Sequence, residues 1–206
     1  MTGIDKDVQA LLDAAAKGNV GAIWSLIDAD SSLVWEKAGD LTALHVAAMA
    51  GEEEAAALLI AKRAGVNANG AAGTPLFHAA LASHQAVVEC LLAYGADTNL
   101  ATASGQTPLM AAAHIGHLAI GRALIERSAN LDAKALSGAN ELGPNLGPVN
   151  GETALHYAAA GGHAAFVALL LESGAKRNIE DNSGLTPCDW ALRHRREAVV
   201  QLLESA

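Results

Sequence analysis

The fold is decided by one short stretch, which reads TPLMAAAHIGH at residues 107–117. Its opening tetrapeptide has counterparts that begin at Thr42, Thr74, Thr153 and Thr186. The steps between successive threonines, Thr107 included, are 32, 33, 46 and 33 residues. Self-similarity at such a period is typical of repeat proteins, in which each repeat is one supersecondary unit stacked on the next.

Each unit reads as two short helices joined by a turn. The threonine suits a hydroxyl N-cap, and the proline or alanine that follows it suits the first helical turn. Alanine pairs such as Ala112-Ala113 let neighbouring helices approach closely. Glycines such as Gly116 suit the left-handed residue that ends the first helix, and leucine pairs such as Leu91-Leu92 form the core of a second helix. We expect the second helices to close at Gly65, Gly95 and Gly174.

Five copies of this pattern resemble the ankyrin repeat family. The family's unit carries a Gly-His pair at the turn between its helices, as at Gly116-His117, and ends in Gly-Ala-Asp-x-Asn, as at residues 95–99. The resemblance implies an all-α ankyrin repeat solenoid of about six helix–turn–helix units, forming a single domain over residues 1–206. We place the units at 4–36 (N-terminal cap), 37–68, 69–101, 102–134, 148–180 and 181–206 (C-terminal cap), with an insertion at 135–147.

The composition fits a helical protein outside the membrane. Hydrophobic residues make up 51% of the chain but aromatic residues only 3%, so the apolar content is mostly alanine and leucine. No apolar run approaches the length of a membrane span, and the N-terminus lacks the basic and apolar regions of a signal peptide. We therefore expect a soluble, cytoplasmic protein without a membrane partner, and we take it to be a monomer.

The charge balance argues against a nucleic-acid partner. The net charge is −9, which repels a phosphate backbone unless the basic side chains gather on one face. The dense basic run, at residues 193–196, falls at the last turn between helices, where positive charge also complements helix carbonyl ends. We interpret this run as a solvated part of the C-terminal cap.

The histidines fit repeat positions better than a metal site. His45 and His156 hold the fourth position of the tetrapeptide, where the resemblance implies an imidazole that hydrogen-bonds the backbone between repeats. His84, His117 and His163 hold the family's turn position. The sequence has no HExxH motif and no paired cysteines, so we expect no metal and no cofactor. Its Ser-Gly pairs lie in loops between repeats, so we name no catalytic residue and leave enzymatic activity uncertain.

The resemblance implies a partner protein or peptide as the ligand. In an ankyrin stack the first helices line a concave face and the loops between repeats project as fingers. The candidate contact residues are Met49, Leu81, His114, Ile115, Arg193 and His194, which follow the alanine pairs, and Gln106 and Glu152 in the fingers. This mostly apolar strip suits an aliphatic peptide or helix. An alternative stays open for Met49, Leu81 and Ile115, which could instead pack between repeats.

The insertion carries a second alternative. Its glycines and prolines argue against a helix, so residues 135–151 form either a tolerated mobile extension or a lid over the concave face. In the lid case the protein could be an enzyme or a small-molecule binder. The site would be enclosed by loop 135–151 against the concave face, with His114 as acid or base.

Overall fold

The structure is a computed structural model that describes residues 3–138, 142 and 149–205. These residues form two compact units, Met1–Leu100 and Ala101–Ala206, and each is described by itself. The boundary between the two coincides, within one residue, with a predicted repeat boundary. Both units are built from short helices, which confirms the expected all-α repeat architecture.

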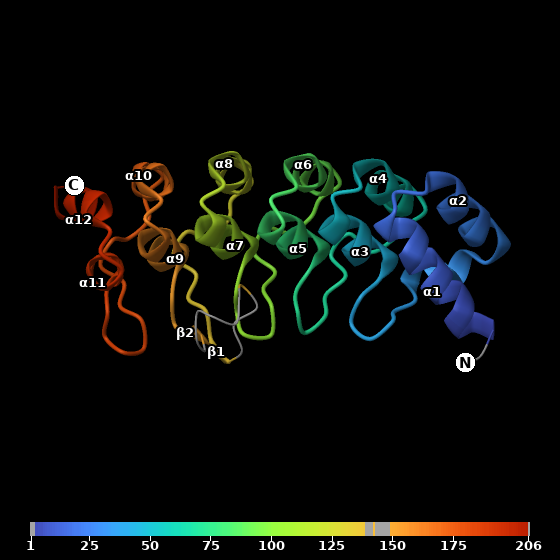
Figure 1. Ribbon diagram of the computed structural model, residues 1–206, viewed down its shortest axis with the longest axis horizontal. Helices are drawn as coiled ribbons and strands as arrows, with labels where there is room; N and C mark the ends of the chain where they lie inside the picture. The colour runs from blue at the N-terminus through green and yellow to red at the C-terminus, as the bar shows by residue number, and fades with distance from the viewer. Residues whose placement is uncertain (1–2, 139–141, 143–148, 206) are drawn as a thin grey trace. The chain divides into compact units, whose positions relative to one another are not determined.

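The first unit consists of α1 (Gly3–Ala16), α2 (Val20–Ala29), the 3-10 helix η1 (Ser31–Trp35), α3 (Ala43–Ala50), α4 (Glu53–Ala61), α5 (Pro75–Leu81) and α6 (Gln85–Ala93). Helices α1, α3 and α5 pack side by side in one layer, and α2 and α4 pack with α6 in another (Figure 1). The N-terminal helix is longer than its counterparts. It begins at Gly3, before Gln9, which is the residue aligned with the threonines. No Thr-Pro pair defines a helix start at Gln9.

The second unit consists of α7 (Pro108–Ile115), α8 (Leu118–Glu126), β1 (Ser137–Gly138), β2 (Val149–Asn150), α9 (Ala154–Gly161), α10 (Ala164–Glu172), α11 (Pro187–Arg193) and α12 (Glu197–Ser205). Helix α9 packs between α7 and α11, and α10 packs between α8 and α12. Figure 1 shows these two layers and the long loops that extend from the first helices of each pair. The first helices and their loops are therefore the parts that carry the predicted contact positions.

The ends of the first helices follow the sequence closely. The Thr107 hydroxyl accepts a hydrogen bond from the Met110 amide at 3.3 Å, and Pro108 begins α7. Three of these helices end at left-handed glycines, Gly51, Gly116 and Gly162, as predicted. The helical starts and stops are thus local properties of the repeated motif.

One predicted helix end is wrong. We expected Gly65 to close α4, but the left-handed residue there is Arg63, with φ 70°. Counting along the repeat, Arg63 occupies the position that Gly95 holds after α6, and Gly65 lies two residues later. A left-handed arginine is strained relative to glycine, so the backbone of the repeat imposes this conformation on the residue.

The core is built from the predicted alanine pairs and leucines. Both alanines of each pair are completely buried, at 47–48, 79–80, 112–113 and 158–159. Leu91 and Leu124 of the second helices are also fully buried. Methyl-sized side chains at these positions allow the close contact between helices that the stack requires.

The insertion begins and ends in a short antiparallel pairing. Ser137 pairs with Asn150 and Gly138 with Val149, forming the two-stranded sheet β1–β2. Residues 139–141 and 143–148 lie outside the described part of the chain, so the central part of the predicted lid or extension does too. The described ends of the insertion are a hairpin stem rather than a helix.

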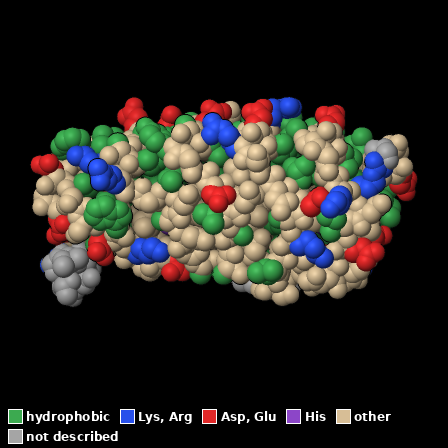
Figure 2. Space-filling view, turned by 180° about the vertical axis from the view of Figure 1, so that it is seen from behind, with side chains coloured by type: hydrophobic (Ala, Val, Ile, Leu, Met, Phe, Trp, Pro, Cys, Tyr) green, Lys and Arg blue, Asp and Glu red, His purple; other side chains and the backbone are tan. Residues whose placement is uncertain are grey.

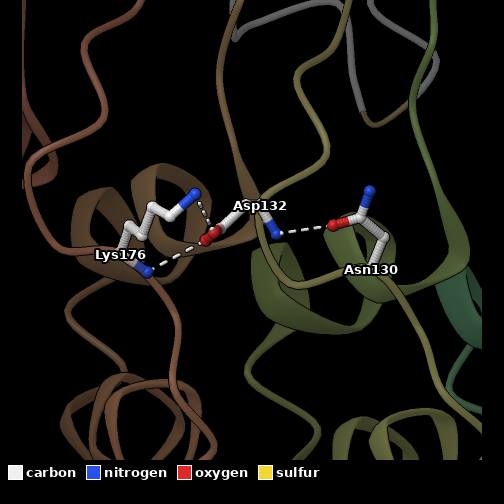
Figure 3. A network of polar contacts seen from close by, with 3 residues as sticks. All are labelled: Asn130, Asp132 and Lys176. Atoms are coloured by element: carbon white, nitrogen blue, oxygen red, sulfur yellow. Dashed lines mark hydrogen bonds and ion pairs between the residues drawn. The ribbon is translucent and has the colours of Figure 1, made fainter.

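The repeat contacts continue across the insertion. The Asp132 carboxylate accepts a hydrogen bond from the Lys176 amide at 2.9 Å and lies 3.4 Å from the Lys176 ammonium (Figure 3). The Asp132 amide donates in turn to the Asn130 side chain at 3.1 Å. These two loops are 44 residues apart in sequence, yet they contact each other as loops of consecutive repeats do. The insertion therefore leaves the stacking of its two flanking repeats intact.

Candidate functional site

Two buried histidines, His45 and His156, each form a hydrogen bond with the loop of the next repeat. His45 is fully buried, and its Nδ1 accepts the Thr42 amide at 3.2 Å. The proton must therefore lie on Nε2, which donates to the Gly73 carbonyl at 3.2 Å. His156 repeats this arrangement and donates to the Leu185 carbonyl at 3.0 Å. The predicted hydrogen bonds between repeats are confirmed for both residues.

Burial keeps these imidazoles neutral. Desolvation in the interior lowers the pKa of His45 from 6.5 to about 4, outweighing its hydrogen bond to Gly73. Desolvation also lowers the pKa of His156. Both rings are therefore uncharged at neutral pH, and each of their nitrogens already makes a hydrogen bond with the backbone.

Two of the turn histidines, His84 and His163, bind the backbone at the other end of the first helices. His84 Nε2 lies 3.1 Å from the Met49 carbonyl, and His163 Nε2 lies 3.0 Å from the His114 carbonyl. Each bond satisfies a carbonyl at the end of the preceding first helix. No group of three or more His, Cys, Asp or Glu residues able to hold a metal occurs in the described part of the chain.

Arg196 takes over this function in the last repeat. Its Nε donates to the Ala160 carbonyl at 2.9 Å, in the position held by histidine in other repeats. The preceding Arg195 is left-handed, with φ 57°, at the position that a left-handed glycine holds in most other repeats and Ser83 holds in one. Part of the basic run at 193–196 is therefore tied to the repeat geometry. On the face shown in Figure 2, Lys and Arg side chains are scattered among Asp and Glu.

We use the name first-helix face for the positions after the alanine pairs, which are residues 49–50 and 81–82 in the first unit and 114–115, 160–161 and 193–194 in the second. Met49 is 45% exposed and Ile115 is 41% exposed, although the rest of their helices is largely buried. Leu81 and His114 are half-buried, and Arg193 and His194 are exposed. Met49 and Ile115 are thus largely available on the surface, and Leu81 is partly covered.

The structure does not place the two predicted finger residues on the surface. Gln106 is completely buried and donates to the Tyr157 hydroxyl at 2.9 Å. Glu152 is 3% exposed, and its side chain accepts the Asn150 amide at 2.8 Å. These side chains organise the bases of the loops instead of facing a partner. The expectation of exposed contact side chains at these two positions is corrected accordingly.

The stem of the insertion makes backbone hydrogen bonds with the same loops. The Leu136 amide donates to the Ser104 carbonyl at 2.7 Å, and the Ala135 amide donates to the Glu152 carbonyl at 2.8 Å. On the other side, the Asn182 amide donates to the Asn150 carbonyl at 2.8 Å. The stem therefore joins the loops before and after it. The burial of Gln106 and Glu152 belongs to their repeat position, because the residue before the threonine is also buried at Gly73 and half-buried at Leu41 and Leu185.

A pocket lies at the first-helix face of the second unit. Its volume is about 220 Å³, and its lining residues are His114, Tyr157, Ala160, Gly161, His194 and Arg196. Four of these belong to the predicted first-helix positions. Sequence reasoning missed Tyr157, which sits one turn earlier on α9, and Arg196, which could have been found by its alignment with the turn histidines.

Aromatic contacts shape this pocket. The rings of His114 and Tyr157 meet edge to face with centroids 6.3 Å apart, and Trp190 lies 6.5 Å from Tyr157. His194 lies 6.2 Å from Trp190 in a tilted arrangement. Burial, followed by the nearby charge of His163, lowers the pKa of His114, so this ring is a neutral hydrogen-bonding group at pH 7.

The pocket does not have the composition expected of an acid–base site. Among the described residues, its lining includes no carboxylate and no residue of loop 135–151. It therefore offers His114 no acidic partner of the kind that the enzymatic alternative requires. What the lining does offer is an apolar floor with nitrogen donors around it.

The comparisons with known proteins agree with the repeat structure. A family model described as "Ankyrin repeats (3 copies)" matches residues 11–102, 65–135 and 133–206. A search of curated proteins found none that matches the chain. In the described residues, no helix is both long enough and apolar enough to span a bilayer. From the repeat period, the stacked helix pairs and this family match together, the chain belongs to the ankyrin repeat family.

Proposed function

We propose that this protein is a binding module that recognises a partner protein or peptide through its first-helix face and adjoining loops. Ankyrin repeats are generally protein–protein interaction modules, which sets the class of function. The observation that carries the proposal is the exposure of Met49 and Ile115. They occupy neighbouring positions of the repeat, Met49 two residues before the turn glycine and Ile115 one residue before it, and both are large apolar side chains on helices that otherwise bury their apolar surface.

The first-helix face as a whole suits a peptide that carries both apolar and hydrogen-bonding side chains. Met49 and Ile115 offer flexible and branched apolar surface, whereas His114 and His194 offer ring nitrogens. The loops contribute mainly backbone and small polar groups, since Gln106 and Glu152 are occupied inside the fold. We therefore place the partner contacts on the helices more than on the fingers. The proposal also takes the protein to be cytoplasmic, monomeric and without a cofactor.

The proposal is tested by selecting peptides and locating where they bind. A random peptide library, displayed with both peptide ends joined to carrier protein, is selected on the wild-type chain. Affinities are then measured for Met49→Lys and Ile115→Lys, with Tyr94→Lys as the matched control. Tyr94 is 52% exposed but lies at the end of α6, a second helix.

A charge placed in an apolar contact removes a favourable interaction and buries an ammonium group. We expect Met49→Lys or Ile115→Lys to weaken binding by about tenfold or more, as at an interface hot spot, and Tyr94→Lys to leave it unchanged. Selected peptides that tolerate both first-helix variants and lose affinity with Tyr94→Lys would place the binding surface elsewhere.

A further inference from the structure

The side chains that line the pocket on α9 and α11 differ in charge from the chain as a whole. The chain has a net charge of −9, yet the ionisable side chains that line this pocket are His114, Tyr157, His194 and Arg196. No carboxylate lies among the lining residues in the described part of the chain. A pocket with cationic and N–H donors in an acidic protein is complementary to an anionic group.

The acidic residues of the neighbouring loop and helix are already engaged. Asp189 accepts the Thr186 amide at 2.8 Å, which caps the start of α11. Asp181 accepts the Trp190 indole N–H at 3.0 Å. These bonds direct both carboxylates toward the N-terminal part of α11, whereas the pocket lies at its C-terminal end with His194 and Arg196.

Arg196 is held in place as a donor. Its Nε bond to the Ala160 carbonyl fixes the guanidinium beside the end of α9 at 2.9 Å. The terminal nitrogens make no hydrogen bond or ion pair with other described residues. A fixed guanidinium loses less entropy on binding a carboxylate than a mobile one, and such charge-assisted bonds are among the stronger ones.

The floor of the pocket is apolar and small. Tyr157 is 1% exposed and its hydroxyl accepts from Gln106, so it forms the buried base of the pocket beside Ala160 and Gly161. The volume of about 220 Å³ is below the range of about 300–1,000 Å³ typical of sites for drug-sized ligands. The space corresponds to a side chain or two rather than to a large metabolite.

We propose that this pocket binds the C-terminal residue of a partner chain, with the free α-carboxylate at Arg196 and His194 and an apolar side chain against Tyr157 and Ala160. This inference rests on the proposed function and specifies one class of partner for it. A C-terminal residue presents a carboxylate and an apolar side chain from a single Cα. In an extended peptide, the side chains next to an internal acidic residue point to the opposite face. One small pocket therefore holds an internal carboxylate together with an apolar side chain less easily.

The test uses three small probes, of which the first two differ in the α-carboxylate alone and the third carries its carboxylate on the side chain in place of a phenyl ring. N-acetyl-L-phenylalanine carries the free α-carboxylate, and N-acetyl-L-phenylalaninamide lacks it. N-acetyl-L-aspartic acid α-amide carries a carboxylate on its side chain. Each is titrated into the isotope-labelled full chain, and amide and Arg196 Nε chemical shifts are followed by NMR.

We expect N-acetyl-L-phenylalanine to shift Gly161, His194 and Arg196 saturably, and the other two probes to bind about tenfold more weakly or worse. The variant His194→Glu should weaken N-acetyl-L-phenylalanine binding by about fivefold or more through like-charge repulsion. Arg122→Glu, a change at an exposed position of α8 that does not line the pocket, should leave it within about twofold. His194 is exposed, so its replacement is compatible with folding.

The proposal is overturned if the acid and the amide bind alike, if the aspartic probe binds as tightly, or if the shifts map outside the pocket. Such a result leaves the proposed function standing when library peptides still bind and still lose affinity with Met49→Lys or Ile115→Lys. If those peptides are insensitive to the first-helix variants as well, both proposals fail together.

Discussion

Acidification is expected to destabilise the protein through His45 before its carboxylates are protonated. His45 is fully buried and neutral, with a pKa lowered by burial from 6.5 to about 4. In the unfolded chain the imidazole returns to its ordinary pKa. Between these two values the unfolded chain binds more protons than the folded one, so the free energy of unfolding falls as the pH falls through this window.

The magnitude follows from the two pKa values. A shift of one pKa unit corresponds to about 1.4 kcal/mol, so the full difference is about 3 kcal/mol below pH 4. Between about pH 7 and about pH 5, the loss attributable to His45 is about 2 kcal/mol. This is a large share of the stability of an ordinary domain, about 5–15 kcal/mol.

The assay is urea unfolding at these two pH values, followed by far-ultraviolet circular dichroism, for the wild type and His45→Gln. The variant is less stable at both pH values because it disturbs the bonds to Thr42 and Gly73. Its loss on acidification should nevertheless be smaller than that of the wild type by about 2 kcal/mol, since the other titrating groups are common to both chains. An equal loss in the two proteins would refute the assignment of a depressed pKa to His45.

Two further predictions concern the contacts between repeats and are measured by the same urea unfolding at neutral pH. Asp132→Ala should cost about 1–2 kcal/mol because the Lys176 amide loses a charged acceptor, whereas Asp132→Asn should cost less than about 1 kcal/mol because the exposed ion pair contributes little. Equal effects of the two changes would contradict the view that the hydrogen bond to the Lys176 amide contributes more than the ion pair. Gly51→Ala places a Cβ 2.6 Å from the His84 ring at φ 81°, and Gly95→Ala meets nothing within 4 Å at φ 82°. The former should cost about 1–2 kcal/mol more than the latter, through the lost hydrogen bond to Met49 and the clash, and similar costs would show that the turn contact is not important for stability.

Most of the helical architecture was predictable because it is encoded locally and repeated. Thr107 and Pro108 specify a helix start, and Gly116 specifies its end, whatever surrounds them. Gly65 shows where this reasoning failed. The left-handed position was assigned by residue type, but the structure follows the spacing of the repeat and places Arg63 there.

The surface was harder to predict, because exposure depends on contacts between distant segments. Met49 and Ile115 are exposed, whereas the sequence left open that they pack between repeats. Gln106 and Glu152 are not, because the residue before the threonine is buried or half-buried in all five copies of the motif, and the side chains there bond within the fold, as Gln106 does to Tyr157. The pocket residue Tyr157 was also missed, because its place depends on a distant contact. Its hydroxyl accepts a hydrogen bond from Gln106, which is 51 residues away in sequence.

The central claim, that a partner binds on the first-helix face, is tested most directly by site-specific photocrosslinking. Benzoylphenylalanine is placed at Ile115 or, as a matched exposed site on a second helix, at Tyr94, and each protein is irradiated with a peptide selected on the wild type. The account predicts crosslinks from Ile115 and none from Tyr94. Crosslinks from Tyr94 in the absence of any from Ile115 would contradict it.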